Sequence, residues 1–404
     1  MSISRSLARP RWGYRTGFWQ PRNPAFWLFS ILVLAGIADF LLIQLFFASM
    51  SSSSLALSWF LVAVYAIPML LVIYHLDLYE REPLSLVTAA LLWGAFVATM
   101  LSGLGNEGWG LVMKDVLDPE AFLQWRSALT APFVEEAAKA CGVVLLYLIV
   151  RAEFDDVMDG FVFGAVVGLG FSVVEDVFYF FDSFGGTVEG VLTGFVFRVV
   201  LTGVYGHALY TGLAGIGIAY FVTHRSDRSG LRRTIVAVGL FAVAVFAHFL
   251  WNSPLLDFFP REVDSLGDYL AFGVAGAIKG IPFLAFGVLM VVLSLRRERR
   301  WLRAALAGEP ERGMITLDEL DLLARPVARL RARWAVRREN GKTPARVMKR
   351  LQRAQINLAM VRTRVEEGNP DLVAQREVCK SLRNQLADVR RSQNESWSRV
   401  RASE

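Results

Sequence analysis

Runs of about 20 apolar residues recur through the first three quarters of this 404-residue chain, and they constrain its fold more than any other feature. Each run is long enough to cross the hydrocarbon core of a bilayer as a helix that rises about 1.5 Å per residue. Hydrophobic residues make up 54% of the chain and the mean hydropathy is +0.41, values that disfavour a disordered chain and a soluble enzyme. The sequence therefore predicts an all-α fold, a polytopic bundle of transmembrane helices.

Eight spans are predicted, and the charges between them orient the bundle. The spans cover residues 26–50, 55–74, 84–104, 128–150, 160–181, 199–221, 234–253 and 270–295. Arginines gather in alternate loops, at Arg151, at Arg225 to Arg233 and from Arg296 to Arg300, which the positive-inside rule places in the cytoplasm. Both termini are thus expected on the cytoplasmic side of the cell membrane. The amphipathic segment 106–129 is expected to lie along the outer interface, as a plain connecting loop in preference to a lid or a docking surface.

The net charge of +6 is unevenly divided along the chain. Residues 296–404 hold 26 lysines and arginines against 14 acidic residues, whereas the preceding part holds 17 against 23. Three parts are therefore predicted: a basic cytoplasmic N-terminus over residues 1–25, a membrane domain over residues 26–295, and a basic cytoplasmic tail over residues 296–404.

The tail is predicted to form a helical hairpin or a short coiled coil. Thr316 and Glu319 make the pattern of an N-terminal capping box. A heptad stripe of apolar residues follows, and a second stripe comes after the turn at Gly368. The first stripe comprises Val347, Leu351, Ala354, Leu358, Val361 and Val365, and the second comprises Val378, Leu382, Leu386 and Val389. The tail's arginines favour a solvated face near anionic lipid over a nucleic-acid surface, and the tail is a candidate site for a cytoplasmic protein partner or for self-association.

A few polar residues interrupt the apolar spans, and they indicate function because charge inside a bilayer is costly. They are Glu135, Glu136 and Lys139 in APFVEEAAK, Glu175 and Asp176 in GFSVVED, His207 in YGHALYTG, and His248 and Asn252 in FAHFLWNSP. From the predicted span ends, four of these positions lie about 8 to 12 Å below the outer surface. Because they lie on four helices of alternating direction, they predict one polar layer and a pocket that opens outward. Lys139 is expected to be a counter-ion, Asp39 is expected to have no catalytic role, and Asp159 is expected to be solvated in a cytoplasmic loop.

Carboxylates, imidazoles and an amide in one pocket suit hydrolysis, and two arrangements stay open. In the first, His and Glu ligands hold a divalent metal, most simply Zn, which acidifies a bound water. In the second, a Glu and a His activate water without a metal, and a second His and an Asn stabilise the oxyanion. Glu135 or Glu136 is the predicted base, and Asn252 is expected to polarise the scissile carbonyl. The predicted metal ligands, or positioning groups, are Glu175, His207 and His248.

The order of these motifs resembles that of the PrsW family of intramembrane proteases. The resembling series runs E-E-x-x-K, D-G-F-V-F-G, G-F-S-x-x-E-D, GHALYTG and H-x-x-x-N, preceded by YHLDLYEREPLSL, and it covers residues 74–252. The last motif is also similar to that of the prenyl-protein endopeptidases in the wider superfamily. Two positions depart from the pattern, because Asp176 stands where relatives commonly have Asn and Asn252 stands where many have Asp.

The resemblance implies a metallo- or glutamate-dependent peptidase within residues 26–295. Its substrate would be a single-span membrane protein, by analogy with relatives that make the first cut of an anti-sigma factor on its extracytoplasmic side. Glu135, Glu136 and His248 match the family's essential positions, and Glu175 and His207 match its second and third motifs. The tail lies outside the resemblance.

Two other classes of function use the same features differently. A proton- or metal-ion transporter also needs intramembrane Glu and His, although the sequence has no inverted repeat and its polar residues form one layer rather than a path across the membrane. A non-catalytic membrane scaffold would depend on the tail instead.

Overall fold

The computed structural model describes residues 17–79, 81–201, 204–225, 228–256, 266–365 and 367–401, and every regular element among them is a helix. The prediction of an all-α polytopic bundle is confirmed. The chain divides into two compact units, Met1–Val291 and Val292–Glu404, each described here by itself. The arginines predicted as a basic N-terminus lie largely before residue 17, outside the described residues.

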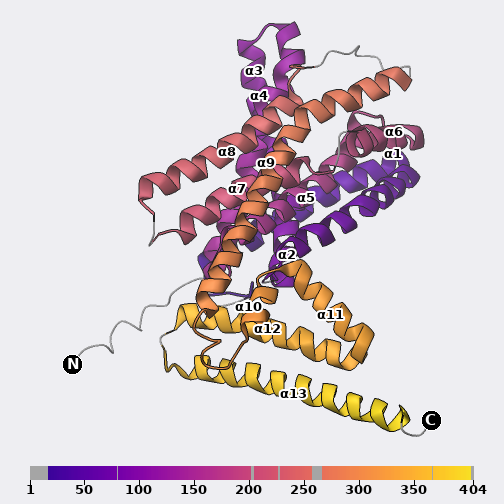
Figure 1. Cartoon of the computed structure of the whole chain (residues 1–404). Coiled ribbons are helices and arrows are strands. Elements are labelled where there is room, and N and C mark those ends of the chain that lie inside the picture. Colours follow the sequence, from indigo (N-terminus) through magenta and orange to yellow (C-terminus); the bar gives the residue numbers. More distant parts are fainter. Residues whose placement is uncertain are drawn as a thin grey trace. The chain divides into compact units, whose positions relative to one another are not determined.

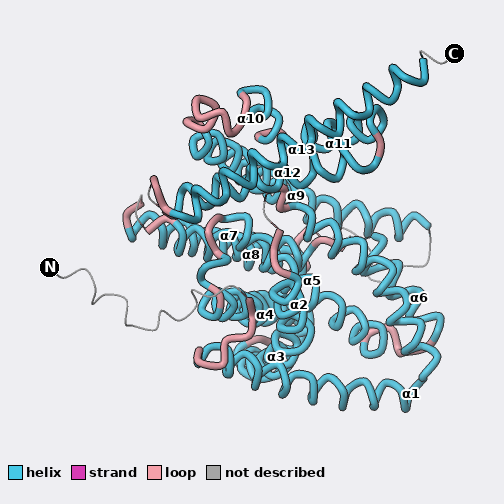
Figure 2. The backbone as a smooth tube through the Cα atoms, turned by 90° about the horizontal axis from the view of Figure 1, so that it is seen from below, coloured by secondary structure: helices cyan, strands magenta, loops and turns pink. Residues whose placement is uncertain are grey.

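The helices of the first unit follow one another along the chain without an intervening strand among the described residues (Figures 1 and 2). They are α1 (Pro24–Leu76), α2 (Leu84–Leu92), the π-helical turn η2 (Trp93–Ala98), α3 (Thr99–Val116), α4 (Pro119–Ile149), the short 3₁₀ turn η3 (Arg151–Glu153), α5 (Val157–Asp182), α6 (Val188–Phe195), the π-helical turn η4 (Val196–Leu201), α7 (Gly206–Thr223), α8 (Gly230–Asn252) and α9 (Leu266–Leu306), which continues into the second unit.

Helix α1 is folded back on itself at Ser51, whose backbone is extended (φ −161°, ψ 103°). The Trp59 indole N–H donates to the Gln44 side chain over 2.8 Å, and the rings of Phe40 and Trp59 lie 5.8 Å apart. In a straight helix these residues would be separated by more than about 20 Å. Residues 24–50 and 52–76 are therefore two antiparallel arms, as the first two predicted spans require.

Five helices among the described residues are long and apolar enough to cross a membrane, or six if the bent pair formed by α6–η4 and α7 is one span. The folded α1 counts once among them, and α4 is not among them. Helix α4 carries Glu135, Glu136 and Lys139 in its middle, which lowers its hydropathy although it covers the predicted fourth span. The multi-pass character is clear, and the count of eight spans stays a prediction.

Helix α5 lies at the centre of the first unit and is almost entirely buried (Figure 1). It packs against α1, α2, α4 and α7. Its contact with α7 is close because glycines on one face remove the side chains between the two backbones. A Cβ atom added at Gly164 would lie 2.3 Å from the carbonyl oxygen of Thr211, and one added at Gly168 would lie 2.1 Å from that of His207.

Replacing Gly168 with Ala is expected to destabilise the bundle by about 1–3 kcal/mol, because the methyl group meets backbone that cannot rotate away. The added methyl group should also push the backbone of His207 away from α5, and this shift should lower the peptidase activity. Thermal unfolding in detergent micelles measures the first effect. Gly239→Ala on α8 is the matched control, since nothing lies within 4 Å of its added Cβ. Equal melting temperatures for the two variants would contradict the close α5–α7 contact.

The segment 106–129 is helical, so the prediction of a connecting loop is wrong. Helix α3 continues to Val116, and α4 begins at Pro119 after the Asp118 side chain has accepted hydrogen bonds from two backbone N–H groups. The Trp109 indole donates to the carbonyl of Leu129 over 3.0 Å. Trp109 thus helps to join α3 and α4 into a hairpin (Figure 1), whereas most other apolar side chains of this segment are exposed.

The predicted sixth span, residues 199–221, is interrupted. Turn η4 ends at Leu201 and α7 begins at Gly206, and residues 202 and 203 lie outside the described part of the chain. His207 is therefore the second residue of α7 rather than a residue in the middle of a continuous helix. The break lets η4 bring Arg198 toward α5, a contact that a straight span would not predict.

In the second unit, α9 is followed by α10 (Leu317–Leu323), α11 (Pro326–Asn340), α12 (Lys342–Arg364) and α13 (Pro370–Arg401). The predicted capping box of Thr316 and Glu319 is present, and α12 packs against α13 across a turn with Gly368 at φ +89°. Cys379, rather than Val378, points inward from α13, and burial raises the pKa of its thiol to about 12. The thiol is therefore protonated and unreactive at neutral pH. Coiled-coil geometry stays a prediction, and Val389 lies outside the described side chains.

Candidate active site

The centre of the site is a buried lysine on α4 between two glutamates of the same helix. The Lys139 ammonium donates to Glu136 Oε1 over 2.9 Å and to Glu135 Oε2 over 3.3 Å. All three side chains are almost fully buried. The spacings of three and four residues place them on one helix face, as the sequence predicts. Lys139 also lies 3.7 Å from the centre of the Phe171 ring. It is the counter-ion that keeps two carboxylates charged away from water.

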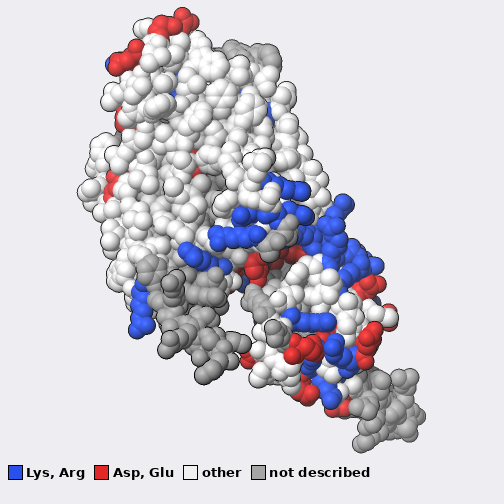
Figure 3. Space-filling model, turned by 90° about the vertical axis from the view of Figure 1, so that its left-hand side faces the viewer, with Lys and Arg blue, Asp and Glu red and all other residues white. Residues whose placement is uncertain are grey.

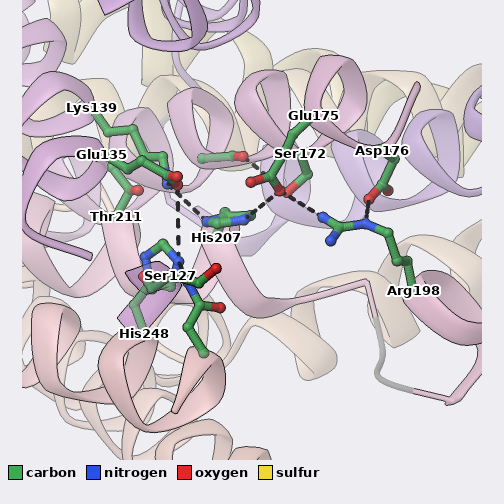
Figure 4. Close-up of polar contacts among 12 residues, drawn as sticks. Ser127, Glu135, Lys139, Ser172, Glu175, Asp176, Arg198, His207, Thr211 and His248 are labelled. Atoms are coloured by element: carbon green, nitrogen blue, oxygen red, sulfur yellow. Dashed lines mark hydrogen bonds and ion pairs between the residues drawn. The ribbon is translucent and has the colours of Figure 1, made fainter. Parts of the chain in front are cut away.

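His207 connects this cluster to α5 (Figure 4). Its Nδ1 lies 2.8 Å from the Lys139 ammonium, and its Nε2 lies 2.9 Å from Glu175 Oε2. Because an ammonium group has no lone pair, Nδ1 is the acceptor and the ring proton belongs on Nε2, where Glu175 accepts it. Both ring nitrogens are thereby oriented.

His248 enters from α8 on the other side of the glutamates. Its Nδ1 lies 3.1 Å from Glu136 Oε1, and its Nε2 lies 3.9 Å from Glu135 Oε2 and 3.2 Å from Asn252 Nδ2. An ionised carboxylate can only accept hydrogen bonds, so Nδ1–H donates to Glu136 and the lone pair of Nε2 faces Asn252 and Glu135. The four-residue spacing of His248 and Asn252 produces this shared face.

The two glutamates differ in their hydrogen-bond partners. Glu136 accepts from Lys139 and His248 at Oε1 and from the Thr211 hydroxyl at Oε2 over 3.1 Å. Glu135 accepts from the Asn106 amide at Oε1 over 3.1 Å and from Lys139 at Oε2 over a longer distance. Glu136 is therefore the more fully bonded carboxylate, and Glu135 keeps more capacity to bind a further group.

Arg198 on η4 pairs with the acidic end of α5 (Figure 4). Its Nη2 donates to Glu175 Oε2 and its Nε to Asp176 Oδ1, both over 2.6 Å. The Tyr65 hydroxyl from α1 donates to the other Asp176 oxygen over 2.6 Å. Arg198 thus completes a chain of charge from Asp176 through Glu175 and His207 to Lys139. No sequence pattern distinguishes Arg198, because a single arginine beside a predicted apolar span looks the same whether it faces water or a buried carboxylate.

A family model described as PrsW family intramembrane metalloprotease matches residues 82–301, more than half of the chain. This chain belongs to the PrsW family. Among curated relatives, a protein named Protease PrsW from Geobacillus kaustophilus is 30% identical over 193 residues, which are 47% of this chain and 70% of that protein. A second Protease PrsW, from Clostridioides difficile, is 32% identical over 130 residues, which are 31% of this chain and 52% of that protein. No solved structure matches the chain.

Membership in the PrsW family makes the chain a membrane-embedded peptidase, and the expected resemblance is confirmed. All six predicted site residues join the same network of contacts in this PrsW-family chain. They are Glu135, Glu136, Glu175, His207, His248 and Asn252. Their individual catalytic and metal-binding roles stay predictions.

The donor set suits the metal that the family description implies. One ligand atom each from Glu135, His207 and His248 lies within 4.8 Å of the others. One carboxylate and two imidazoles with an open position are a donor set of catalytic zinc sites. Glu175, predicted as a ligand, is not part of this group, and its carboxylate pairs with Arg198 and His207 instead.

Two other polar residues, neither of which was predicted to be buried, are buried as well. Lys279 on α9 is buried inside the predicted eighth span and donates to the carbonyl of Ser253 over 2.8 Å, next to Asn252. Asp159 was expected to be solvated, but it is buried and accepts from two backbone N–H groups ahead of α5. It forms a second acidic group with Asp77 and Glu82. The local sequence indicates only that Asp159 caps the start of α5; it does not indicate the contact of Asp159 with Asp77 and Glu82.

Proposed function

We propose that this PrsW-family peptidase cuts a single-span membrane protein near the outer face of the cell membrane, and that an anti-sigma-factor-like protein is its substrate class. Glu175 lies near the end of α5, His248 near the end of α8, and His207 at the start of α7. These three positions support a site close to one side of the bilayer. The arginines of the loop after α4, the α7–α8 loop and the distal part of α9 favour the opposite side as cytoplasmic.

One observation carries the proposed chemistry: Glu135 Oε2 and His248 Nε2 are two acceptors 3.9 Å apart in a buried site. A water oxygen can lie about 2.8 Å from both of them, because the two hydrogen bonds together exceed this separation. Such a water directs both protons at the protein and its lone pairs away from it. This water is positioned to act as a nucleophile, and Glu135 and His248 are the two groups that can accept its protons.

In the proposed reaction, Asn252 donates to the scissile carbonyl while the water takes its place at His248 Nε2. The water oxygen attacks the carbonyl carbon as its proton passes to Glu135, and Glu135 then gives that proton to the leaving amine. Glu136 holds His248 and Lys139 in place during both steps. In the alternative arrangement, Glu135, His207 and His248 would hold a zinc ion in place of their contacts with Lys139 and the water, and the ion would supply Lewis-acid polarisation of the water or carbonyl instead of the base Glu135.

The decisive experiment uses the purified chain in proteoliposomes with a single-span substrate that carries a soluble outer domain. We expect one cut within a few residues of the outer membrane border, mapped by mass spectrometry of the released domain. Metal analysis of the same preparation, before and after treatment with a chelator, should show zinc lost together with activity.

Proton or zinc flux across the same vesicles, without cleavage of any single-span protein, would overturn the proposal in favour of a transporter. Full cleavage after complete removal of metal would retain the peptidase and reject the metal ligands proposed here.

A further inference from the structure

Helix α11 has two unlike faces. Arg329 and Val336 are 4% and 5% exposed and lie on the side that packs against α12. On the opposite side, Val327 is 63% exposed, Leu330 is 48% exposed and Trp334 is 67% exposed. The spacing of three and four residues makes these three side chains one continuous apolar stripe. The second unit leaves this stripe uncovered.

Arginines share the exposed face of α11 with the apolar stripe. Arg331 and Arg338 lie four residues after Val327 and Trp334, respectively, and Arg337 borders the same face; all three are exposed. The only acidic residue of α11 is Glu339, at its C-terminal end. A protein-binding core is usually depleted of charge, whereas an interfacial membrane helix combines arginines with Trp and Leu on adjoining faces.

Chain connectivity keeps α11 close to a bilayer. Helix α9 continues from an apolar, membrane-length segment into the arginine run at 296–300 and ends at Leu306. Only residues 307–325 separate it from α11. A tether this short makes docking on the membrane that α9 crosses an intramolecular event. In Figure 3 charged side chains are dense on the tail and sparser over the rest of the visible surface, where acidic residues gather at one end.

We propose that α11 lies along the anionic leaflet on the side where α9 leaves the bilayer. Val327, Leu330 and Trp334 insert at the boundary between headgroups and acyl chains, and Arg331, Arg337 and Arg338 contact lipid phosphates. Tryptophan favours this boundary, and arginine can bury its stem while its guanidinium stays among the headgroups. The occupant of the stripe is thus the lipid surface.

The test uses the full chain, one copy per nanodisc, in phosphatidylcholine alone and in phosphatidylcholine with phosphatidylglycerol. Hydrogen exchange of the α11 amides is expected to slow by about 5-fold or more when the anionic lipid is present, and added salt should reduce the effect. Arg331→Gln with Arg338→Gln should remove most of the protection, and so should Leu330→Glu with Trp334→Glu.

Val373→Glu is the matched control, because Val373 is 48% exposed on α13 and lies off the α11 stripe. It should leave the protection of α11 unchanged. Exchange of the α12 amides reports whether each variant keeps the tail folded. Equal exchange of α11 in the two lipids overturns the proposal. Protection that appears only with two chains per nanodisc also overturns it and identifies a second copy of the chain as the occupant.

Discussion

Replacing Glu135 with Gln is expected to lower cleavage of a single-span substrate by about 10²- to 10⁴-fold, the range that removal of a general base produces. The amide has nearly the shape of the carboxylate but cannot accept a proton from water. Its hydrogen bonds with Asn106 and Lys139 can partly re-form, so the folded protein should persist. Initial rates with purified protein in proteoliposomes measure the effect.

Glu120→Gln is the control for this variant, since Glu120 is an exposed carboxylate in the first turn of the same helix. It should cleave at the wild-type rate. Wild-type activity in Glu135→Gln, at unchanged protein abundance, would reject Glu135 as the base. Loss of activity in Glu136→Gln alone would transfer that role to Glu136, whose bonds to Lys139, His248 and Thr211 indicate a positioning role.

Replacing Lys139 with Met is expected to cost about 3–5 kcal/mol of unfolding free energy, as removing one partner of a buried ion pair does. Glu135 and Glu136 would then face each other without a counter-ion, and His207 would lose the group that lies 2.8 Å from its Nδ1. Cleavage should fall with stability. Denaturant unfolding in mixed micelles measures the change.

A double variant distinguishes lost charge balance from lost packing. Lys139→Met combined with Glu136→Gln removes one charge of each sign and should recover part of the stability lost in Lys139→Met alone. Lys114→Met, at an exposed position on α3, should be nearly neutral. A double variant less stable than Lys139→Met would show that the charge pairing is not what stabilises α4.

Patterns that depend on neighbouring residues predicted local features well. The spacings of Glu135 with Lys139 and of His248 with Asn252 place each pair on one face, and the contacts follow. The same reasoning failed where two segments meet. The amphipathic residues after Asn106 fit a loop at an interface, yet they form two helices that pack against each other, joined by the Trp109–Leu129 hydrogen bond and the Arg126–Glu107 ion pair.

Partner choice across helices was the least predictable part of the site. Glu175 and Asp176 were expected among the polar residues, but their pairing with Arg198 depends on the break after η4. The sequence shows only that Arg198 lies next to an apolar run. Whether it faces water or a buried carboxylate is decided by where α1, α5 and η4 pack together.

The sequence by itself determined a helical membrane protein and its few exceptional polar residues. Lipid cannot satisfy backbone hydrogen bonds, so long apolar runs must be helices, and any charge within them needs a partner. Only the tertiary structure decided which residues those partners are. Lys139 contacts two glutamates and a histidine, Arg198 binds Glu175, and Glu136 orients His248. Hydrogen bonds require agreement within a few tenths of an ångström between residues far apart in the chain, and helix periodicity carries no such information.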